Sequence, residues 1–260
     1  MNSAPCWHHA LARLIAICIV GTASLGANGA QQQKETYVIV HGAWGGGWSF
    51  KKTDELLTEA GHRVYRPSLT GQGERHHLAS PDVGLSTHVL DVVNTIVFED
   101  LKEVILVGHS YGGMVITGVA DSIPERIKRL VYLDAFLPND GESALTARPD
   151  GQDGPESWAS DGFIKPAWVR DTDPFPRDVP QSLKTFTEPV SYKKAEALAL
   201  SATYILTVDD GRKREEDMFH FFSERAKARN WTVVDIVADH NPQMTMPATL
   251  ARLLADVVNP

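Results

Sequence analysis

Cysteine is nearly absent from this sequence, and the little there is lies at one end. Cys6 and Cys18 are the only cysteines in the 260 residues. If the segment that carries them is removed, the rest of the chain holds no thiol. A thiol nucleophile, disulfide cross-links and cysteine-based metal binding are then excluded, so core packing must stabilise the fold.

Clusters of basic residues are also missing. The chain carries 33 Asp and Glu residues against 25 Lys and Arg, with no basic run and no basic stripe interleaved with aromatic residues. Proteins that bind nucleic acid usually concentrate positive charge on one face. We therefore expect no nucleic-acid partner.

Long apolar runs are scarce, and the clearest one lies near the start of the chain. Leu14–Val20 is unbroken and apolar, follows a short polar start with one arginine, and precedes a stretch of small residues that ends at Ala30. This order is typical of a secretory signal peptide, and the run is too short to span a membrane. We predict that residues 1–30 are a signal peptide. The mature chain, residues 31–260, would then be secreted or periplasmic, with no membrane span.

Beyond residue 35 the sequence alternates between two patterns. Runs rich in β-branched residues occur at Tyr37–Val40, Arg63–Tyr65, Glu103–Val107, Leu130–Leu133, Thr203–Thr207 and Thr232–Val237. Helical stretches lie between most of them, at Trp48–Ala60, Ser86–Phe98, Tyr111–Ser122, Glu215–Arg229 and Pro247–Val258. Strands that alternate with helices predict an α/β domain with a mostly parallel sheet and helices on both faces.

One stretch interrupts the alternation. Residues 138–200 are rich in Pro, Asp and Gly, contain scattered aromatic residues and show no run of the earlier strand type. A disordered linker would contain few aromatic residues. We expect a small cap, inserted over the carboxyl edge of the sheet.

The sharpest chemical signal is a serine between glycines. Gly108-His109-Ser110-Tyr111-Gly112 follows a predicted strand and opens a predicted helix. A serine at such a turn has a strained backbone and needs neighbours nearly bare of side chains, which the glycines supply. The helix start points free N–H groups at a developing oxyanion. Ser110 is therefore the candidate nucleophile.

A second turn carries the complementary group. The predicted strand before His41 runs into His41-Gly42-Ala43, and three glycines follow Trp44. Backbone N–H groups at such a strand end are free, so the N–H of Ala43 and that of Tyr111 form a candidate oxyanion hole. A phosphate cradle is excluded, because neither glycine-rich nucleotide-binding spacing occurs here.

The proton acceptor must be a histidine, and His240 fits best. It closes the strand-like segment Thr232–Asp239 and lies C-terminal to the serine, as the order serine, acid, histidine requires. The acid is open from the residues alone. Asp209 and Asp210 follow one predicted strand, and Asp134 follows another. Each of these aspartates could instead cap a turn.

No metal site is expected. His76, His77 and His88 lie near Asp82, but their spacing matches no known ligand pattern. A serine, a histidine and an acid also need no cofactor, so we expect neither a metal nor an organic cofactor.

Taken together, four motifs over about residues 36–258 resemble those of the α/β-hydrolase superfamily. More narrowly, they resemble its branch of plant hydroxynitrile lyases, plant methylesterases and related bacterial esterases. The motifs are His41–Trp44, Gly108–Gly112, Tyr132–Pro138 and Asp239–His240.

The resemblance implies a role for each motif residue. Ser110 would be the nucleophile, His240 the base, and the backbones of Ala43 and Tyr111 the oxyanion donors. The branch keeps Thr-x-x-Asp after the strand that precedes the acid, and this implies Asp210. The resemblance thus implies an α/β-hydrolase fold and hydrolysis of a carboxylic ester through an acyl-enzyme.

Two departures from the lyases of the branch favour ester hydrolysis. Those lyases have Thr after the opening His and Lys after the base His, where this sequence has Gly42 and Asn241. Without that lysine, no cation stabilises departing cyanide. A cofactor-free hydroxynitrile lyase, a carbon–carbon hydrolase and a non-catalytic small-molecule binding protein remain the alternatives. The cap aromatics favour an apolar or aromatic ester substrate.

Overall fold

The computed structural model describes Met1, residues 34–149 and residues 154–257. The predicted signal peptide, residues 1–30, therefore lies outside the described residues apart from Met1. Within the described ranges, every helix is too short or too polar to cross a membrane.

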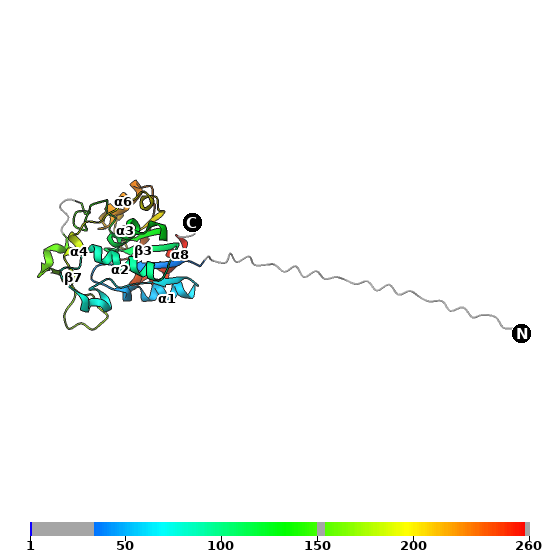
Figure 1. The fold of residues 1–260 in the computed structure, drawn as a ribbon, viewed down its shortest axis with the longest axis horizontal. Coiled ribbons are helices and arrows are strands. Elements are labelled where there is room, and N and C mark those ends of the chain that lie inside the picture. The colour runs from blue at the N-terminus through cyan, green and yellow to red at the C-terminus, as the bar shows by residue number, and fades with distance from the viewer. Residues whose placement is uncertain (2–33, 150–153, 258–260) are drawn as a thin grey trace. The chain divides into compact units, whose positions relative to one another are not determined.

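A six-stranded sheet with the order β2-β1-β3-β4-β8-β9 forms the centre of the fold (Figure 1). Neighbouring strands are parallel throughout. The strands are β1 (Thr36–Val40), β2 (Arg63–Tyr65), β3 (Val104–His109), β4 (Ile127–Leu133), β8 (Ala202–Val208) and β9 (Thr232–Val237). The six predicted strands lie within one or a few residues of these bounds, and the prediction of a parallel sheet is confirmed.

Helices cover both faces of this sheet. On one face, α1 (Lys51–Glu59) and α8 (Pro247–Asp256) pack their apolar side chains against those of β1, β3 and β4. On the other face, α2 (Leu85–Phe98), α3 (Gly112–Ser122) and α6 (His220–Ala228) do the same. The central strands are buried on both faces, which explains why they read as nearly continuous apolar runs.

Shorter elements lie in the connections between the strands and the longer helices. These include the 3₁₀ turns Gly47–Phe50, Gly73–Leu78, Pro124–Arg126, Pro155–Trp158 and Arg214–Glu216, and the short helices α4 (Lys184–Thr187), α5 (Ala195–Leu198) and α7 (Pro242–Thr245).

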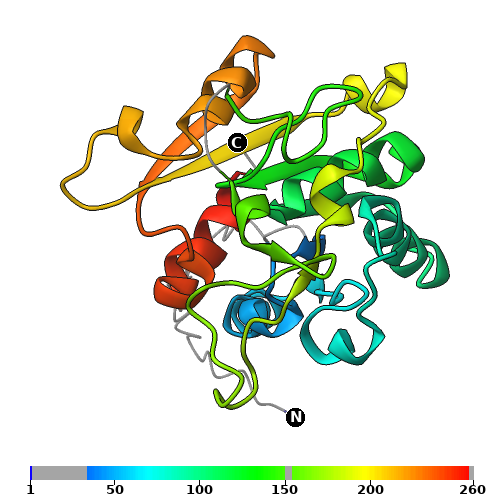
Figure 2. The same ribbon diagram turned by 90° about the vertical axis from the view of Figure 1, so that its left-hand side faces the viewer.

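The predicted cap is an irregular segment with its own small sheet. Between β4 and β8 the chain forms an antiparallel three-stranded sheet of β5 (Ala159–Ser160), β6 (Phe163–Ile164) and β7 (Gln181–Ser182). Figure 2 shows this yellow-green part of the chain gathered at one end of the folded body. The cap contacts the turn after β1, because the Trp44 indole Nε1 donates to Ile164 O (3.1 Å) and Gln181 Oε1 accepts from Trp44 N (2.9 Å).

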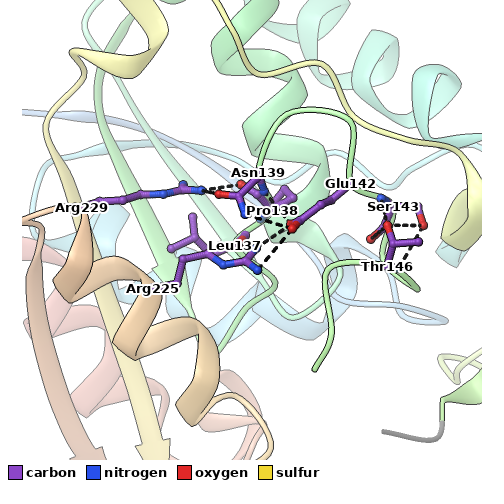
Figure 3. Close-up of polar contacts among 8 residues, drawn as sticks. All are labelled: Leu137, Pro138, Asn139, Glu142, Ser143, Thr146, Arg225 and Arg229. Carbon is purple, nitrogen blue, oxygen red and sulfur yellow. Dashed lines mark hydrogen bonds and ion pairs between the residues drawn. The ribbon is translucent and has the colours of Figure 1, made fainter. Parts of the chain in front are cut away.

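Two arginines, one within α6 and one directly after it, hold the first residues of the cap by hydrogen bonds (Figure 3). Arg225 donates to Leu137 O (2.8 Å) and to Glu142 Oε2 (2.5 Å). Arg229 donates to Pro138 O (2.7 Å) and Asn139 Oδ1 (2.8 Å). Burial would raise the pKa of Glu142, but hydrogen bonds from Asn139 and Arg225 outweigh it and hold the pKa below its usual range. The chain leaving β4 is thus fixed to α6.

Candidate active site

Ser110 lies on the sharp turn between β3 and α3, as its sequence motif predicts. Its φ of 53° is in the left-handed region, which costs a non-glycine residue free energy. Backbone hydrogen bonds hold it there: Ser110 N donates to Leu133 O (3.2 Å), while Ser110 O accepts from Gly113 N and Phe136 N, both at 3.1 Å. The turn presents the hydroxyl at the carboxyl edge of the sheet.

The glycines around Ser110 are required by close packing. A Cβ at Gly108 would lie 2.7 Å from Gly112 O, and one at Gly112 would lie 2.6 Å from Val40 O. A Cβ at Gly113 would lie only 2.0 Å from Phe136 O. Side chains at these positions would push the strand, the turn and the helix apart.

His240 faces the nucleophile from the loop after β9. Its Nε2 lies 3.0 Å from Ser110 Oγ, within hydrogen-bonding distance. Its Nδ1 lies 2.6 Å from Asp134 Oδ2. With Nδ1 protonated toward the carboxylate, Nε2 is the free acceptor for the serine proton. The structure therefore brings together Ser110 and His240, the two side chains that the sequence predicted to meet.

The acid partner differs from the sequence expectation. Asp134, not Asp210, contacts the imidazole. Asp134 is almost fully buried, and its second oxygen, Oδ1, accepts from Thr207 N (3.1 Å). The φ of Asp134 is 44°, and its own N donates to Ile205 O (2.7 Å). This tight turn directs the side chain from the end of β4 across to His240.

The lengths of β4 and β8 explain why Asp134, and not Asp210, contacts His240. Leu133, the last residue of β4, pairs with Ile205, but β8 continues to Val208 along β9. Asp209 and Asp210 therefore start beyond the point where β4 has ended, and both are exposed. Asp209 instead forms an ion pair with Arg212 (3.6 Å).

Phe219 and His109 also hold His240 in place, and the sequence assigned neither of them this role. Phe219 stacks on His240 with the ring planes 7° apart and the centroids 4.9 Å apart. His109 Nε2 donates to His240 O (2.8 Å). Burial holds the pKa of His109 well below its usual range, so its ring is neutral.

A second carboxylate lies near the acid. Burial, followed by the charge of Asp134, raises the pKa of Asp217 to about 6. Asp217 Oδ1 accepts from Phe219 N (2.7 Å), which ties this carboxylate to the residue that stacks on His240. Asp217 is thus part of the surroundings of the imidazole without touching the serine.

The expected oxyanion donors lie on two turns, the turn after β1 and the turn that carries Ser110. Within residues 34–149 and 154–257, no protein group accepts a hydrogen bond from the backbone N–H of Ala43 or of Tyr111. His41 braces the first turn, because its Nδ1 donates to Gly42 O (2.8 Å) and its Nε2 accepts from Leu69 N (3.1 Å). Both N–H groups are free to bind an oxygen.

A cavity of about 430 Å³ opens beside these groups. Its walls include Ser110, His240 and Ala43, together with Trp44, Trp48, Trp168, Asp178, Asn241, Gln243 and Met244. No Lys or Arg is among the described residues that line it. The cavity thus joins the serine and histidine to aromatic and acidic side chains. The described residues contain no group of His, Cys, Asp and Glu side chains that could hold a metal ion.

Known proteins resemble the chain in sequence and in structure. The sequence is 39% identical to the carbendazim hydrolyzing esterase of Nocardioides sp. over 241 residues, or 84% of this chain and 98% of that protein. It is 39% identical to the alpha-hydroxynitrile lyase of Arabidopsis thaliana over 114 residues, which is 42% of each chain. A pyrethroid hydrolase from Sphingobium faniae superposes with a TM-score of 0.67 at 22% identity, covering 87% of this chain and 98% of that one.

The sequence profile of the Alpha/beta hydrolase family matches residues 37–253, which include every residue of the site. The predicted fold and the resemblance to the esterase and lyase branch are both confirmed. The chain is therefore an enzyme, a carboxylic ester hydrolase, and it belongs to the alpha/beta hydrolase family.

Proposed function

We propose that this enzyme hydrolyses carboxylic esters through an acyl-enzyme on Ser110, with His240 as the base and Asp134 as the acid. The observation that carries the proposal is the continuous chain of contacts from Ser110 Oγ to His240 Nε2 (3.0 Å) and from His240 Nδ1 to Asp134 Oδ2 (2.6 Å). Serine hydrolases use this arrangement to activate a hydroxyl that is otherwise a weak nucleophile.

Acylation moves one proton and exchanges one bond. Ser110 Oγ bonds to the ester carbonyl carbon while its proton passes to His240 Nε2. The carbonyl oxygen becomes an oxyanion, which the N–H groups of Ala43 and Tyr111 stabilise. The carbon–oxygen bond to the alcohol then breaks, and the alcohol leaves with the proton from His240.

Deacylation repeats these steps with water. His240 takes a proton from a water molecule, whose oxygen attacks the acyl carbon. The bond to Ser110 Oγ breaks, the acid leaves, and His240 returns the proton to Oγ. Asp134 accepts the Nδ1 hydrogen bond throughout and stabilises the imidazolium that forms twice in the cycle.

Two features support hydrolysis over cyanide elimination. A Cβ at Gly42 would lie 2.9 Å from His109 Nδ1 and 3.0 Å from Ser110 Cβ, so a threonine is not accommodated there without movement. Asn241 supplies no positive charge, and no Lys or Arg is among the described residues that line the cavity. Departing cyanide would therefore have no lysine or arginine beside it, whereas a leaving alcohol needs only the proton on His240.

The aromatic walls of the cavity favour esters with an apolar or aromatic part. Carbendazim, on which the Nocardioides relative acts, is one candidate substrate to include in a panel of p-nitrophenyl and methyl esters.

The panel tests the proposal when it is run on the wild type and on Ser110→Ala. We expect the variant to fold and to lose roughly 10³-fold or more of kcat, because the remaining groups can stabilise an oxyanion but cannot form the acyl-enzyme. Retention of more than about a tenth of wild-type kcat would overturn Ser110 as the nucleophile.

We further propose that residues 1–30 direct secretion, on the strength of the apolar run Leu14–Val20 and the small residues after it. Expression of the full chain in a bacterial host, followed by N-terminal sequencing of the periplasmic or extracellular protein, tests this directly. A product that keeps Met1 and stays in the cytoplasm would contradict it.

A further inference from the structure

Asp178 is a carboxylate in the cavity, and it has no cationic partner among the residues that the structure describes. Its Oδ2 accepts a hydrogen bond from the Trp168 indole Nε1 (2.8 Å), and no described residue donates to its Oδ1. Burial raises the pKa of Asp178, and the bond from Trp168 opposes this only in part. The triad chemistry makes no use of this side chain.

The position of Asp178 is fixed relative to the turn that carries the oxyanion donor. A Cβ at Gly45 would lie 3.9 Å from Asp178 Oδ1. The next residue, Val179, donates its N–H to Trp44 O (2.8 Å). Backbone bonding on one side and the Trp168 indole on the other hold the carboxylate in place, as a binding group requires.

The neighbours of Asp178 suit an aromatic ligand with a hydrogen-bond donor. Trp44 and Trp168 form an edge-to-face pair, with centroids 5.3 Å apart, on the same cavity. The Asp178 carboxylate, with one oxygen that accepts no hydrogen bond from a described residue, thus lies on a cavity with indole walls.

A purely structural role explains Asp178 poorly. One acceptor is enough to hold the Trp168 indole, and an asparagine would supply it without the free-energy cost of a half-buried charge. Trp168 is itself 57% exposed, so its N–H could bond to water instead. The second carboxylate oxygen remains unexplained without a ligand.

We propose that Asp178 determines specificity by accepting a hydrogen bond from an N–H group on the aromatic part of the ester substrate, while Trp44 and Trp168 contact its ring. This inference rests on the proposed function, because it places the substrate in the same cavity as Ser110. The N–H group is either neutral, as in an azole, or part of an ammonium.

Two matched pairs of esters test the proposal. Methyl 1H-indole-5-carboxylate and its N-methyl derivative differ in the neutral N–H, which a methyl group replaces. Methyl 4-(aminomethyl)benzoate and methyl 4-ethylbenzoate have the same size and differ in the ammonium. Values of kcat/KM are measured for the wild type, Asp178→Asn and Asp171→Asn. Asp171 is the control, because it belongs to the same segment, is exposed and pairs with Lys165 (2.7 Å).

We expect the wild type to prefer the N–H member of at least one pair by about tenfold or more, the range of a hydrogen bond to a charged group. Asp178→Asn should reduce that preference to about twofold or less, because the amide oxygen keeps the Trp168 bond and an NH2 group, which donates, replaces the second carboxylate oxygen. Asp171→Asn should keep the full preference. The affected pair distinguishes a neutral N–H from an ammonium. Equal rates within both pairs for the wild type, or a preference that survives in Asp178→Asn, would overturn the proposal.

A binding measurement separates this proposal from the proposed function. Calorimetric titration of Ser110→Ala with both pairs of esters reports recognition without turnover. If the wild type hydrolyses no ester, the proposed function fails, and the titration still decides the role of Asp178. Tighter binding of the N–H member of at least one pair, lost in Ser110→Ala/Asp178→Asn, supports it; equal affinities within both pairs contradict it.

Discussion

Among single residues, Asp134 and Asp210 differ most clearly in what surrounds them. Asp134 is 1% exposed and bonds to both His240 and Thr207, whereas Asp210 is exposed after the end of β8. A carboxylate can orient an imidazole only from hydrogen-bonding distance. The proposed acid is therefore Asp134, although the family resemblance of the sequence implied Asp210.

Exchange of each aspartate for asparagine separates these two residues. We expect Asp134→Asn to lose on the order of 10²–10⁴ in kcat, because His240 loses its oriented tautomer and the stabilisation of its cation. Asp210→Asn should stay within about threefold of wild type, since surface substitutions away from the site change little. Steady-state kinetics on folded variants measures both, and the reverse ranking would return the acid to Asp210.

At the level of single residues, the sequence identified a site residue best where the local structure that this residue needs is visible in the neighbouring sequence. Ser110 needs glycines on both sides, and His240 needs a strand end, so the printed sequence points to each. The acid needs only to reach the imidazole, and three aspartates follow suitable strands. The choice depends on how far β8 runs past β4, and no single segment of sequence contains that difference.

At the scale of elements, the segment that follows β4 connects the central sheet to the cap. Asp134 directs its side chain to His240, and a few residues later the chain is bonded to α6 through Arg225. The same helix follows Phe219, which stacks on His240. The contacts of Arg225 with Leu137 and Glu142 thus connect two segments that both support the imidazole (Figure 3).

Removal of this connection should lower stability. We expect Arg225→Ala to reduce the free energy of unfolding by about 2 kcal/mol, because the partly buried Glu142 loses its charged partner and Leu137 O loses a donor. Arg212→Ala is the control: its pair with Asp209 is exposed, and its loss should cost no more than about 0.5 kcal/mol. Urea unfolding measures both, and an equal loss in the two variants would show that the Arg225 contacts contribute no more than an exposed ion pair.

Element boundaries were largely predictable, and the internal structure of the cap was not. The central parallel strands are buried on both faces, so their apolar runs mark them in sequence. Residues 138–200 were expected to form a small cap, but no strand within it was predicted. The small sheet β5–β7 consists of two-residue strands, which are too short to show alternation. The contacts that hold it, such as Trp44 with Ile164, join residues far apart in the chain.

For the whole molecule, buried neutral histidines link stability to pH. Burial lowers the pKa of His41 and that of His88 to about 4, and it holds that of His109 well below its usual range. His88, within α2, bonds to the Tyr111 hydroxyl (3.0 Å) and to Thr70 O (3.0 Å), so it braces the nucleophile turn from inside the core.

These shifts predict a loss of stability in mild acid. In the unfolded chain the histidines take up protons as pH falls below about 6.5, whereas the folded chain resists this until about pH 4. Each lowered pKa therefore stabilises the fold above pH 6.5, and this stabilisation is lost between about pH 6.5 and 4. Asp217, with its pKa raised to about 6, acts in the opposite direction.

Three histidines outweigh Asp217 and Asp178, the two carboxylates whose pKa burial raises, so the free energy of unfolding should fall by a few kcal/mol between about pH 7 and pH 4.5. Urea unfolding at several pH values measures this change. A free energy that stays flat or rises toward pH 4.5 would contradict the neutral burial of His41, His88 and His109.

The central claim about the molecule is that an ester acylates Ser110. The most direct measurement is the intact mass of the enzyme, quenched in acid within the first turnovers of p-nitrophenyl acetate, followed by peptide mapping. We predict one added acetyl group on the peptide that contains Ser110, a burst of p-nitrophenol that matches it, and neither signal in Ser110→Ala. Turnover of the ester with no acylated Ser110, under conditions in which deacylation limits the rate, would contradict the account.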